Sequence, residues 1–406
     1  MGTFFKNMVT VITWLLLARF SAKAQQTTTI VDSALLQRVE ALENAVARQR
    51  PGEDHFMVVG LTTFGYVHNH TVNTVGGVSQ RSRTSSLGDA DHYEFSPMLL
   101  WRHGTRFLME FEPSFNNDGL SVNWADVSYF ACPGLIVRAG YLVIPFGMYN
   151  KRLAAGWIDK LATDPIGIDQ PPSSDYGVEV EGGLPLGNMK WSYDFALTNG
   201  MQLLPDGEIQ GAGINDNNLN KTVTGRLALL PFSNSSLELG LSGLLGKVGD
   251  AGSVFQNAGA KMAAVDLNFV RTFDPILVNI KGQYNVIKIN RQSYINPNDS
   301  TQQYSFDNTS TSGFAQLSVR PVSAGQILKN FEVAFRYGNY TTPTRSLWGA
   351  KTNQLDIGLC YWITWRSVIK VTHEALDGTS TVNKEVGTDQ GKTKTHSWFL
   401  QFSIQL

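Results

Sequence analysis

The sequence has little of what soluble enzymes and metal proteins use. Its 406 residues include two cysteines and seven histidines. No zinc-type spacing, glycine-rich phosphate loop or nucleophile elbow occurs in a supporting context. The sequence therefore predicts no metal, no cofactor and no catalytic residue. The cysteines, Cys132 and Cys360, fall on predicted strands that are not neighbours, so free thiols are expected rather than a disulfide.

An excess of charge of one sign is also missing. Lys and Arg total 33 and Asp and Glu total 34, which gives a formal net charge of -1. This balance excludes nucleic acid as an expected partner and gives no support to a strongly cationic channel. Aromatic residues make up 11% of the chain and there are 38 glycines. Membrane barrels with aromatic girdles and tight turns have this profile.

The first 24 residues have the pattern of a secretory signal peptide. Lys6 supplies a positive start, Val9 to Ala18 an apolar run, and Ala22-Lys23-Ala24 a small-x-small cleavage site. As a membrane anchor the run is too short, because a helix needs about 20 apolar residues to cross. Export with cleavage after Ala24 is expected. After that point no stretch has the apolar length of a membrane helix.

The last residues alternate as one strand does. Trp398, Leu400, Phe402, Ile404 and Leu406 share one face. In a soluble sheet this face would form an apolar edge strand that invites aggregation, whereas a closed membrane barrel has no edge. Alternation alone also fits a soluble sandwich. The signal peptide and the loop pattern described next favour a barrel in the outer membrane.

Sixteen amphipathic strands are predicted between residues 55 and 406. They cover 55–68, 90–102, 105–116, 119–132, 134–144, 175–185, 188–199, 221–231, 235–247, 259–273, 275–289, 312–321, 329–340, 352–364, 366–377 and 396–406. Short links alternate with long polar links such as 69–89, 200–220, 290–311 and 378–395, as in outer-membrane proteins. The predicted fold is all-β, a 16-stranded antiparallel transmembrane β-barrel with a short N-terminal helix. Barrels of this size leave a water-filled channel unless something plugs them.

That helix lies in residues 25–54, an expected periplasmic segment. Leu35, Val39, Leu42 and Val46 follow heptad spacing within 32–49. Two heptads are too few for a stable isolated coiled coil. An oligomeric coil and a lone flexible or docked helix both remain open.

Residues 145–174 form the longest predicted outer loop. Such a loop with its own apolar residues is expected to fold into the barrel, although a surface loop for extracellular partners is the alternative. If it folds inward, Lys151, Arg152, Asp159 and Lys160 are candidates for a pore constriction, where charge acts on a focused field.

Strand parity sorts the remaining charges toward the lumen. Its basic residues give the candidate lumen-lining set, which consists of Arg106, Arg138, Lys190, Arg226, Arg320 and Arg336. The inward acids outnumber the inward bases, and opposite charges on neighbouring strands cancel much of the field. Selectivity for anions or for cations is left open.

Three segments resemble the phosphate-selective porin family of Gram-negative outer membranes. They are Gly140 to Gly147 (GYLVIPFG), Asp175 to Val180 (DYGVEV) with Gly182, and Ala196 to Gly200 (ALTNG). The resemblance covers about a quarter of the chain and extends to length and strand number. It implies a homotrimer of 16-stranded barrels that passes small anions such as phosphate. The mixed charge of the inward set departs from the arginine ladder and lysine cluster of that family's anion-selective members.

The sequence therefore predicts an outer-membrane porin for passive diffusion of small hydrophilic solutes or ions, with outer-membrane lipid around it. A structural or partner-binding barrel of an envelope complex is the alternative. A hydrolase is a third reading, since His68 and His70 lie near the outer rim, but no nearby acid supports a catalytic role. Bilayer conductance separates the first reading from the other two.

Overall fold

The computed structural model of the protein describes residues 54–88, 93–156, 158–211, 213, 216, 218–296, 299–381 and 390–406. The predicted signal peptide and the predicted helix at 32–49 lie outside these residues. Within the described ranges, no helix is both long and apolar enough to cross a bilayer.

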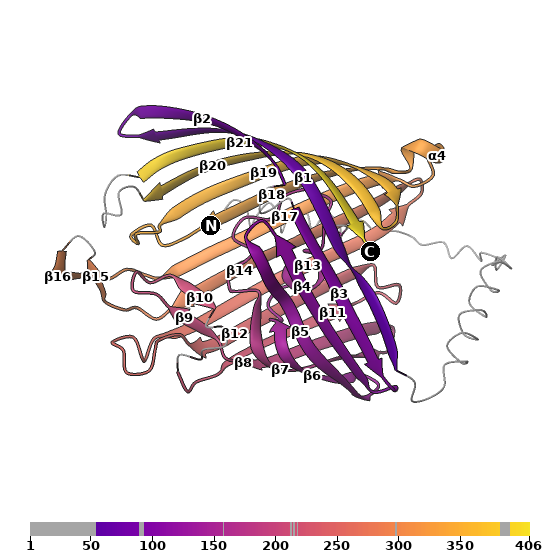
Figure 1. Ribbon diagram of the computed structural model, residues 1–406, viewed down its shortest axis with the longest axis horizontal. Helices are drawn as coiled ribbons and strands as arrows, with labels where there is room; N and C mark the ends of the chain where they lie inside the picture. The colour runs from indigo at the N-terminus through magenta and orange to yellow at the C-terminus, as the bar shows by residue number, and fades with distance from the viewer. Residues whose placement is uncertain are drawn as a thin grey trace. The chain divides into compact units, whose positions relative to one another are not determined.

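Sixteen antiparallel strands close into a ring (Figure 1). The sheet has 17 strands, because β2 is an additional strand that pairs with β1 outside the ring. Strand β1 also pairs with β3 and with β21, so the first and last strands of the ring meet. The ring strands are β1 (His55–Val75), β3 (Tyr93–His103), β4 (Phe107–Asn116), β5 (Gly119–Cys132), β6 (Leu135–Val143), β7 (Ser174–Leu186), β8 (Met189–Thr198), β11 (Thr222–Leu230), β12 (Leu237–Lys247), β13 (Gly259–Phe273), β14 (Ile276–Ile289), β17 (Thr309–Pro321), β18 (Phe331–Thr341), β19 (Ala350–Thr364), β20 (Ser367–Thr381) and β21 (Gln390–Gln405). The predicted fold class is confirmed.

Burial alternates along each strand because successive side chains point to opposite faces. On β21, Leu400 is 49% exposed and Phe402 36%, whereas Gln401 is 6% exposed and Ser403 is fully buried. Apolar side chains therefore cover the outside of the ring and polar side chains its inside. A closed ring satisfies every ladder hydrogen bond without an edge, as hydrocarbon requires.

Several predicted loops contain strands of their own. The predicted first strand ends at residue 68, but β1 continues to Val75 and turns back as β2 (Val78–Leu87). Gly76 and Gly77 make this turn with φ of +56° and +82°, the left-handed values that tight hairpin turns require. The prediction stopped early because residues 69–87 are polar on both faces and lack an apolar alternation.

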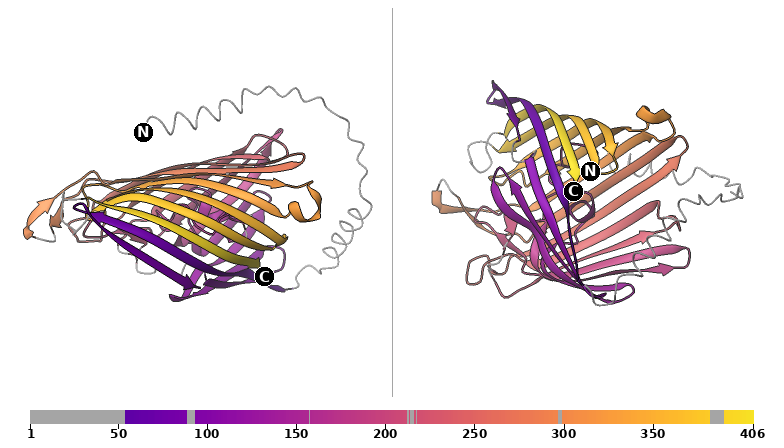
Figure 2. Two further views of the ribbon diagram at one scale, coloured as in Figure 1. Left: turned by 90° about the horizontal axis from the view of Figure 1, so that it is seen from above. Right: turned by 45° about the vertical axis from the view of Figure 1, so that its right-hand side comes forward.

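Smaller elements lie in the other links. The predicted loop 200–220 contains β9 (Met201–Leu203) and β10 (Ile209–Gly211), and the loop 290–311 contains β15 (Tyr294–Asn296) and β16 (Asp299–Tyr304). Two short helices are α3 (Tyr149–Arg152) and α4 (Gly325–Leu328). The β1–β2 and β15–β16 hairpins project at one end of the ring and α4 lies at the other (Figures 1 and 2). The long links thus share one rim.

Phe402 tests the outward face of the closing strand. Its neighbours across the ladder are Phe64 on β1 and Ile369 on β20. A charge on a lipid-facing position costs up to ~2–4 kcal/mol at the midplane, with acids at the lower end. Phe402→Asp should therefore reduce the heat-modifiable form in outer-membrane fractions several-fold, whereas Phe402→Leu should leave it unchanged. Equal amounts of both variants would contradict the lipid-facing assignment.

Candidate pore constriction

The β6–β7 loop (residues 144–173) contacts the inward side of strands from both halves of the ring. Lys151 reaches β7 and β8, and the amide of Ala162 donates to Thr372 Oγ1 on β20 at 3.0 Å. Gly156, which lies between these two residues in the sequence, packs closely against the wall: a Cβ added to it would lie 2.9 Å from Ser403 Oγ on β21 and 3.1 Å from Thr63 Oγ1 on β1. The loop therefore meets the inner wall at widely separated strands.

The loop begins with a turn that only glycine fits. Gly147 has φ of +67°, and a Cβ there would come within 2.1 Å of the Gln283 side chain on β14. Its amide donates to Ser242 Oγ at 3.0 Å, and the amides of Met148 and Tyr149 both donate to Gln283 Oε1, at 2.9 and 3.0 Å. Three backbone donors of the turn are thus satisfied by two wall side chains.

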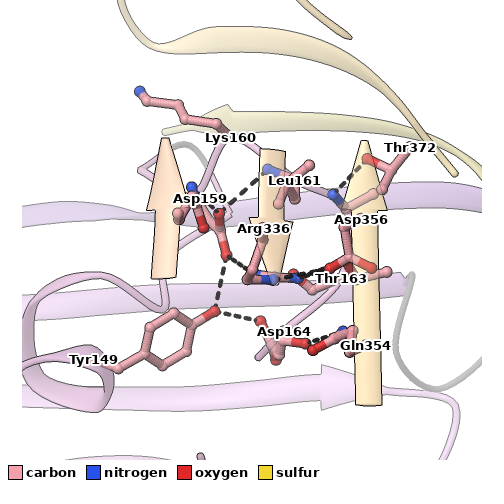
Figure 3. A network of polar contacts seen from close by, with 12 residues as sticks. Tyr149, Asp159, Lys160, Leu161, Thr163, Asp164, Arg336, Gln354, Asp356 and Thr372 are labelled. Atoms are coloured by element: carbon pink, nitrogen blue, oxygen red, sulfur yellow. Dashed lines mark hydrogen bonds and ion pairs between the residues drawn. The ribbon is translucent and has the colours of Figure 1, made fainter. Parts of the chain in front are cut away.

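Arg336 on β18 is the centre of the polar network that holds the far part of the loop (Figure 3). Its Nη1 lies 3.3 Å from Asp159 Oδ2 of the loop, and its Nη2 lies 2.7 Å from Asp356 Oδ2 of β19. Nη2 also donates to the carbonyl and the hydroxyl oxygen of Thr163. One guanidinium, 1% exposed, therefore joins two strands of the wall to two residues of the loop.

Backbone groups of the loop are satisfied in the same region. The amide of Ile166 donates to Gln354 Oε1 at 2.8 Å, and Gln354 Nε2 donates to the carbonyl of Asp164 at 2.9 Å. Lys370 Nζ donates to the carbonyl of Leu161 at 3.0 Å. Buried loop backbone needs such partners, since an unpaired polar group costs about 1–3 kcal/mol.

Tyr149 connects the two ends of the loop. Its hydroxyl lies 2.9 Å from Asp159 Oδ2 and 2.6 Å from Asp164 Oδ1. Burial raises the pKa of Asp164, and burial, with the two nearby carboxylates, raises the pKa of Tyr149 well above its usual value. Because a hydroxyl carries one proton, Tyr149 donates to one of these two carboxylates at a time. In contrast, burial acts against the Asp159 carboxylate, but Arg336 and two lysines outweigh it and lower its pKa.

Lys151 holds the near part of the loop on the opposite wall. Its Nζ lies 2.5 Å from Glu179 Oε1, 2.8 Å from Glu181 Oε2 and 2.8 Å from Asp194 Oδ1. Burial alone would lower the pKa of this ammonium group, but the surrounding carboxylates raise it, so Lys151 stays charged. The three carboxylates are close enough together to hold a cation, and the ammonium group is the cation they contact here.

Arg152 and Lys160 complete the predicted set of constriction residues. Arg152 Nη1 lies 2.5 Å from Glu238 Oε1 on β12, and the arginine side chain is 39% exposed. Lys160 Nζ lies 3.8 Å from Glu332 Oε2 and 4.3 Å from the centre of the Trp362 ring. All four residues predicted for the constriction therefore contact charged groups of the inner wall, although Asp159 and Lys151 face their partners more than open solvent.

The predicted lumen-lining residues divide into three kinds. Arg138 lies between Glu110 and Glu181, at 3.4 and 3.3 Å, and Arg226 between Asp266 and Glu238, at 2.6 and 2.9 Å. Arg336 anchors the β6–β7 loop. Lys190 donates to Ser235 Oγ in an exposed turn, and Arg320 donates to the carbonyl of Lys329. The last two lie at the short-turn rim rather than midway along the wall.

Arg106 does not belong with them. The predicted strand 105–116 begins at Phe107, so Arg106 lies in the preceding turn. It is exposed, and its Nη1 donates at 3.3 Å to the hydroxyl of Tyr129. Tyr129 shares the outward parity of Val127, which is 45% exposed. The prediction placed Arg106 inward because it extended strand parity by one residue into a turn.

Sequence reasoning missed the uncharged partners of the loop, Gln283, Gln354 and Thr372. They sit at inward positions of predicted strands, where any polar residue is compatible with a water-filled lumen. Only their burial, at 4%, 2% and 0% exposure, separates them from solvated residues. Cys360 is similarly covered, and its thiol lies 2.8 Å from the carbonyl of Lys160. Both cysteines are free.

No known protein-family profile matches the chain, and no curated protein matches it either. Solved structures share its fold. The outer-membrane channel DcaP of Acinetobacter baumannii is 11% identical, with 88% of this chain and 99% of that one covered and a TM-score of 0.53. An anion-selective porin from Comamonas acidovorans is 13% identical, with 86% and 100% covered and a TM-score of 0.50. At these identities the similarity establishes the fold alone.

Arg336 tests the anchoring of the loop. Arg336→Leu leaves Asp159 and Asp356 as buried carboxylates without their guanidinium partner, and breaking a buried ion pair in this way costs about 3–5 kcal/mol. The barrel hydrogen bonds are unaffected, so the loop should detach while the ring persists. Trypsin should then cleave after Lys151, Arg152 or Lys160 at least tenfold faster, as followed by mass spectrometry.

Arg320→Gln is the matched control, because Arg320 lies on the adjacent strand β17 but contacts no loop residue in the described hydrogen bonds and ion pairs. Adding Asp159→Asn and Asp356→Asn to Arg336→Leu removes the unpaired charges and should restore part of the protection. Unchanged cleavage in Arg336→Leu would show that the other contacts suffice to hold the loop.

Proposed function

We propose that the protein is a porin of the bacterial outer membrane that allows passive diffusion of small hydrophilic solutes or ions. The observation that carries this proposal is the closed ring with an apolar outside and a polar inside, with a charged loop bound to that inside. The predicted signal peptide, the short resemblance to phosphate-selective porins and the shared fold with an outer-membrane channel support it. Diffusion through such a pore needs no cofactor and no catalytic group.

The β6–β7 loop is the proposed constriction. Its anchors lie on both sides, through Lys151 on β7 and β8 and through Asp159 on β18. A loop held at both ends keeps a fixed aperture, because its backbone donors and charges have wall partners. Arg152, the most exposed of the four residues predicted for the constriction, is the side chain proposed to meet passing solutes. Size exclusion at this position is the proposed mechanism.

On the wall beside the first half of the loop, carboxylates outnumber bases. Five carboxylates, Glu110, Asp126, Glu179, Glu181 and Asp194, surround two bases, Arg138 and Lys151. Nearby, Glu94 and Glu112 are held by the neutral donors Ser114 and Asn123. The phosphate preference implied by the family resemblance would need an excess of bases here. We therefore propose a weak cation preference of the pore.

The assembly proposed from the sequence is a homotrimer in outer-membrane lipid. The apolar outside of the ring provides a surface for lateral pairing, and the predicted helix at 32–49 has heptad spacing for additional pairing. Cleavage of the signal peptide after Ala24 remains the expected route to this location. Deleting residues 25–50 should leave a foldable barrel, because the described ring begins at His55.

Planar-bilayer recording of the purified full-length chain tests the channel proposal. The wild-type protein should give discrete conductance steps. Arg336→Leu should raise the single-channel conductance by roughly 1.5-fold or more, since a released loop widens the constriction. The Arg320→Gln control should match the wild type. Absence of any conductance in correctly folded protein would favour the structural or partner-binding barrel instead.

The double variant Glu94→Gln, Glu112→Gln tests the proposed cation preference. Glutamine keeps a hydrogen-bond acceptor for Ser114 and Asn123 but removes the negative charge of this carboxylate pair, so the reversal potential in a tenfold KCl gradient should move toward the anion side. The difference should shrink near 1 M salt, where the Debye length is about 3 Å. Asp377→Asn removes an exposed carboxylate from the outward face and serves as the control. A reversal potential already on the anion side in the wild type would refute the cation preference.

A further inference from the structure

The β1–β2 hairpin projects at the long-loop rim, where it continues the sheet beside β21 and β20 (Figures 1 and 2). Their registers align outward positions at successive levels. At the lowest level, His68, Trp398 and His373 lie side by side; at the next level His70 and His396 do, with Arg83 of β2 beside His70. Above these, Val72 of β1 lies between Lys394 of β21 and Arg81 of β2, and Thr74 is opposite Lys392. Residues directly opposite in an antiparallel pair share a face.

This outward surface, the basic patch, consists of Arg81, Arg83, Lys392 and Lys394 with His68, His70, His373 and His396. The four permanently charged side chains are exposed. Among the described residues of these four strands, the one acid on the same face is Asp377, whose Oδ2 lies 3.3 Å from Lys394 Nζ. The patch therefore has a clear excess of positive charge.

At the levels of these cations, the opposite face of β2 and of β21 has no such charge. On β2 the inward positions between and beside the arginines are Gln80, Ser82 and Thr84, and on β21 they are Thr393 and Thr395. Solubility alone would place lysine and arginine on either face of a protruding ribbon. Here the cations of β2 and of residues 390–396 of β21 occupy one face, the one continuous with the apolar outside of the barrel.

The patch begins where the apolar surface ends. Below it on the same faces lie Tyr66, Leu400 and Val371, all exposed and paired at one level. Trp398, 54% exposed and 4.7 Å from the His373 ring, lies at the boundary. Tryptophan at the edge of an apolar band marks the level of the lipid headgroups. The histidines start at this level, and the four permanent cations stand two to six residue pairs above it.

We propose that the basic patch binds the phosphorylated headgroup of the glycolipid in the outer leaflet. Phosphate oxygens accept hydrogen bonds from arginine in a bidentate way, and lysine adds point charges. Basic residues just above an apolar band attract anionic headgroups, by about 1 kcal/mol for each lysine or arginine near the surface. The inference rests on the proposed outer-membrane location and goes beyond diffusion through the pore. A second copy of this chain is the competing occupant, and its own basic patch would repel this one.

The test uses full-length protein in nanodiscs of zwitterionic phospholipid, with diphosphorylated lipid A and its dephosphorylated form as probes. Binding is measured by native mass spectrometry and by tryptophan fluorescence. The contribution of Trp398 to the fluorescence is obtained by comparison with the Trp398→Phe variant. The patch variant changes Arg81, Arg83, Lys392 and Lys394 to Gln. It should bind diphosphorylated lipid A at least tenfold more weakly than the wild type, and the wild type should prefer the phosphorylated probe.

The control variant removes four exposed bases at the other rim, Arg102, Arg271, Lys329 and Arg366, and should bind within twofold of the wild type. Equal binding by the patch variant and the wild type would overturn the proposal. So would unchanged lipid binding with a changed oligomeric state, because the patch would then be a contact between copies. Conductance of the same preparations keeps the two proposals separate, since a non-conducting wild type that binds lipid A through the patch refutes only the channel.

Discussion

Closure of the backbone hydrogen-bond ladder is the constraint on which the rest of the molecule depends. Strand β1 pairs with β21 on one side and with β3 on the other, so no strand of the ring has a free edge. In hydrocarbon an unpaired peptide group costs several kcal/mol. Closure therefore fixes the even strand number, the outward apolar face and the inward polar face. The inward face then becomes the only place where charged side chains at membrane depth can be retained.

The β6–β7 loop uses that inward face. A loop inside a barrel loses water around its backbone and must find partners on the wall. Gln283, Gln354 and Thr372 supply neutral partners, and Arg336 supplies a charged one that bridges Asp159 and Asp356. Such pairs contribute little net stability but are costly to break on one side. The arrangement therefore favours one position of the loop over alternatives more than it stabilises the fold.

The sequence predicts the ring well because period-two alternation is imposed by lipid on one side and water on the other. Most of the sixteen strands lie close to their predicted limits, whereas β1 runs seven residues further than predicted and β21 begins six residues earlier. Arg138, Arg226 and Arg336 lie on ring strands, each between carboxylates. The rim was less predictable. The β1–β2 hairpin has water on both faces, so its polar alternation carries no apolar signal, and Arg106 was misplaced by a turn one residue longer than expected. The pairing of Lys151 with three carboxylates depends on where a long loop docks, which no local pattern encodes.

That pairing also changes how the charges of the loop act. Considered alone, Lys151, Arg152 and Lys160 predict attraction of anions at a constriction. In the folded chain Lys151 Nζ lies within 2.8 Å of three carboxylates, and Arg152 lies 2.5 Å from a fourth. A base that is paired with a carboxylate contributes little to the electrostatic potential in the pore, because the opposite charge of its partner cancels its potential at distances longer than their separation. In the proposed pore, the sign of the potential then depends on the wall carboxylates that exceed the anchoring bases. Holding the loop in place and attracting anions are therefore competing uses of the same side chains.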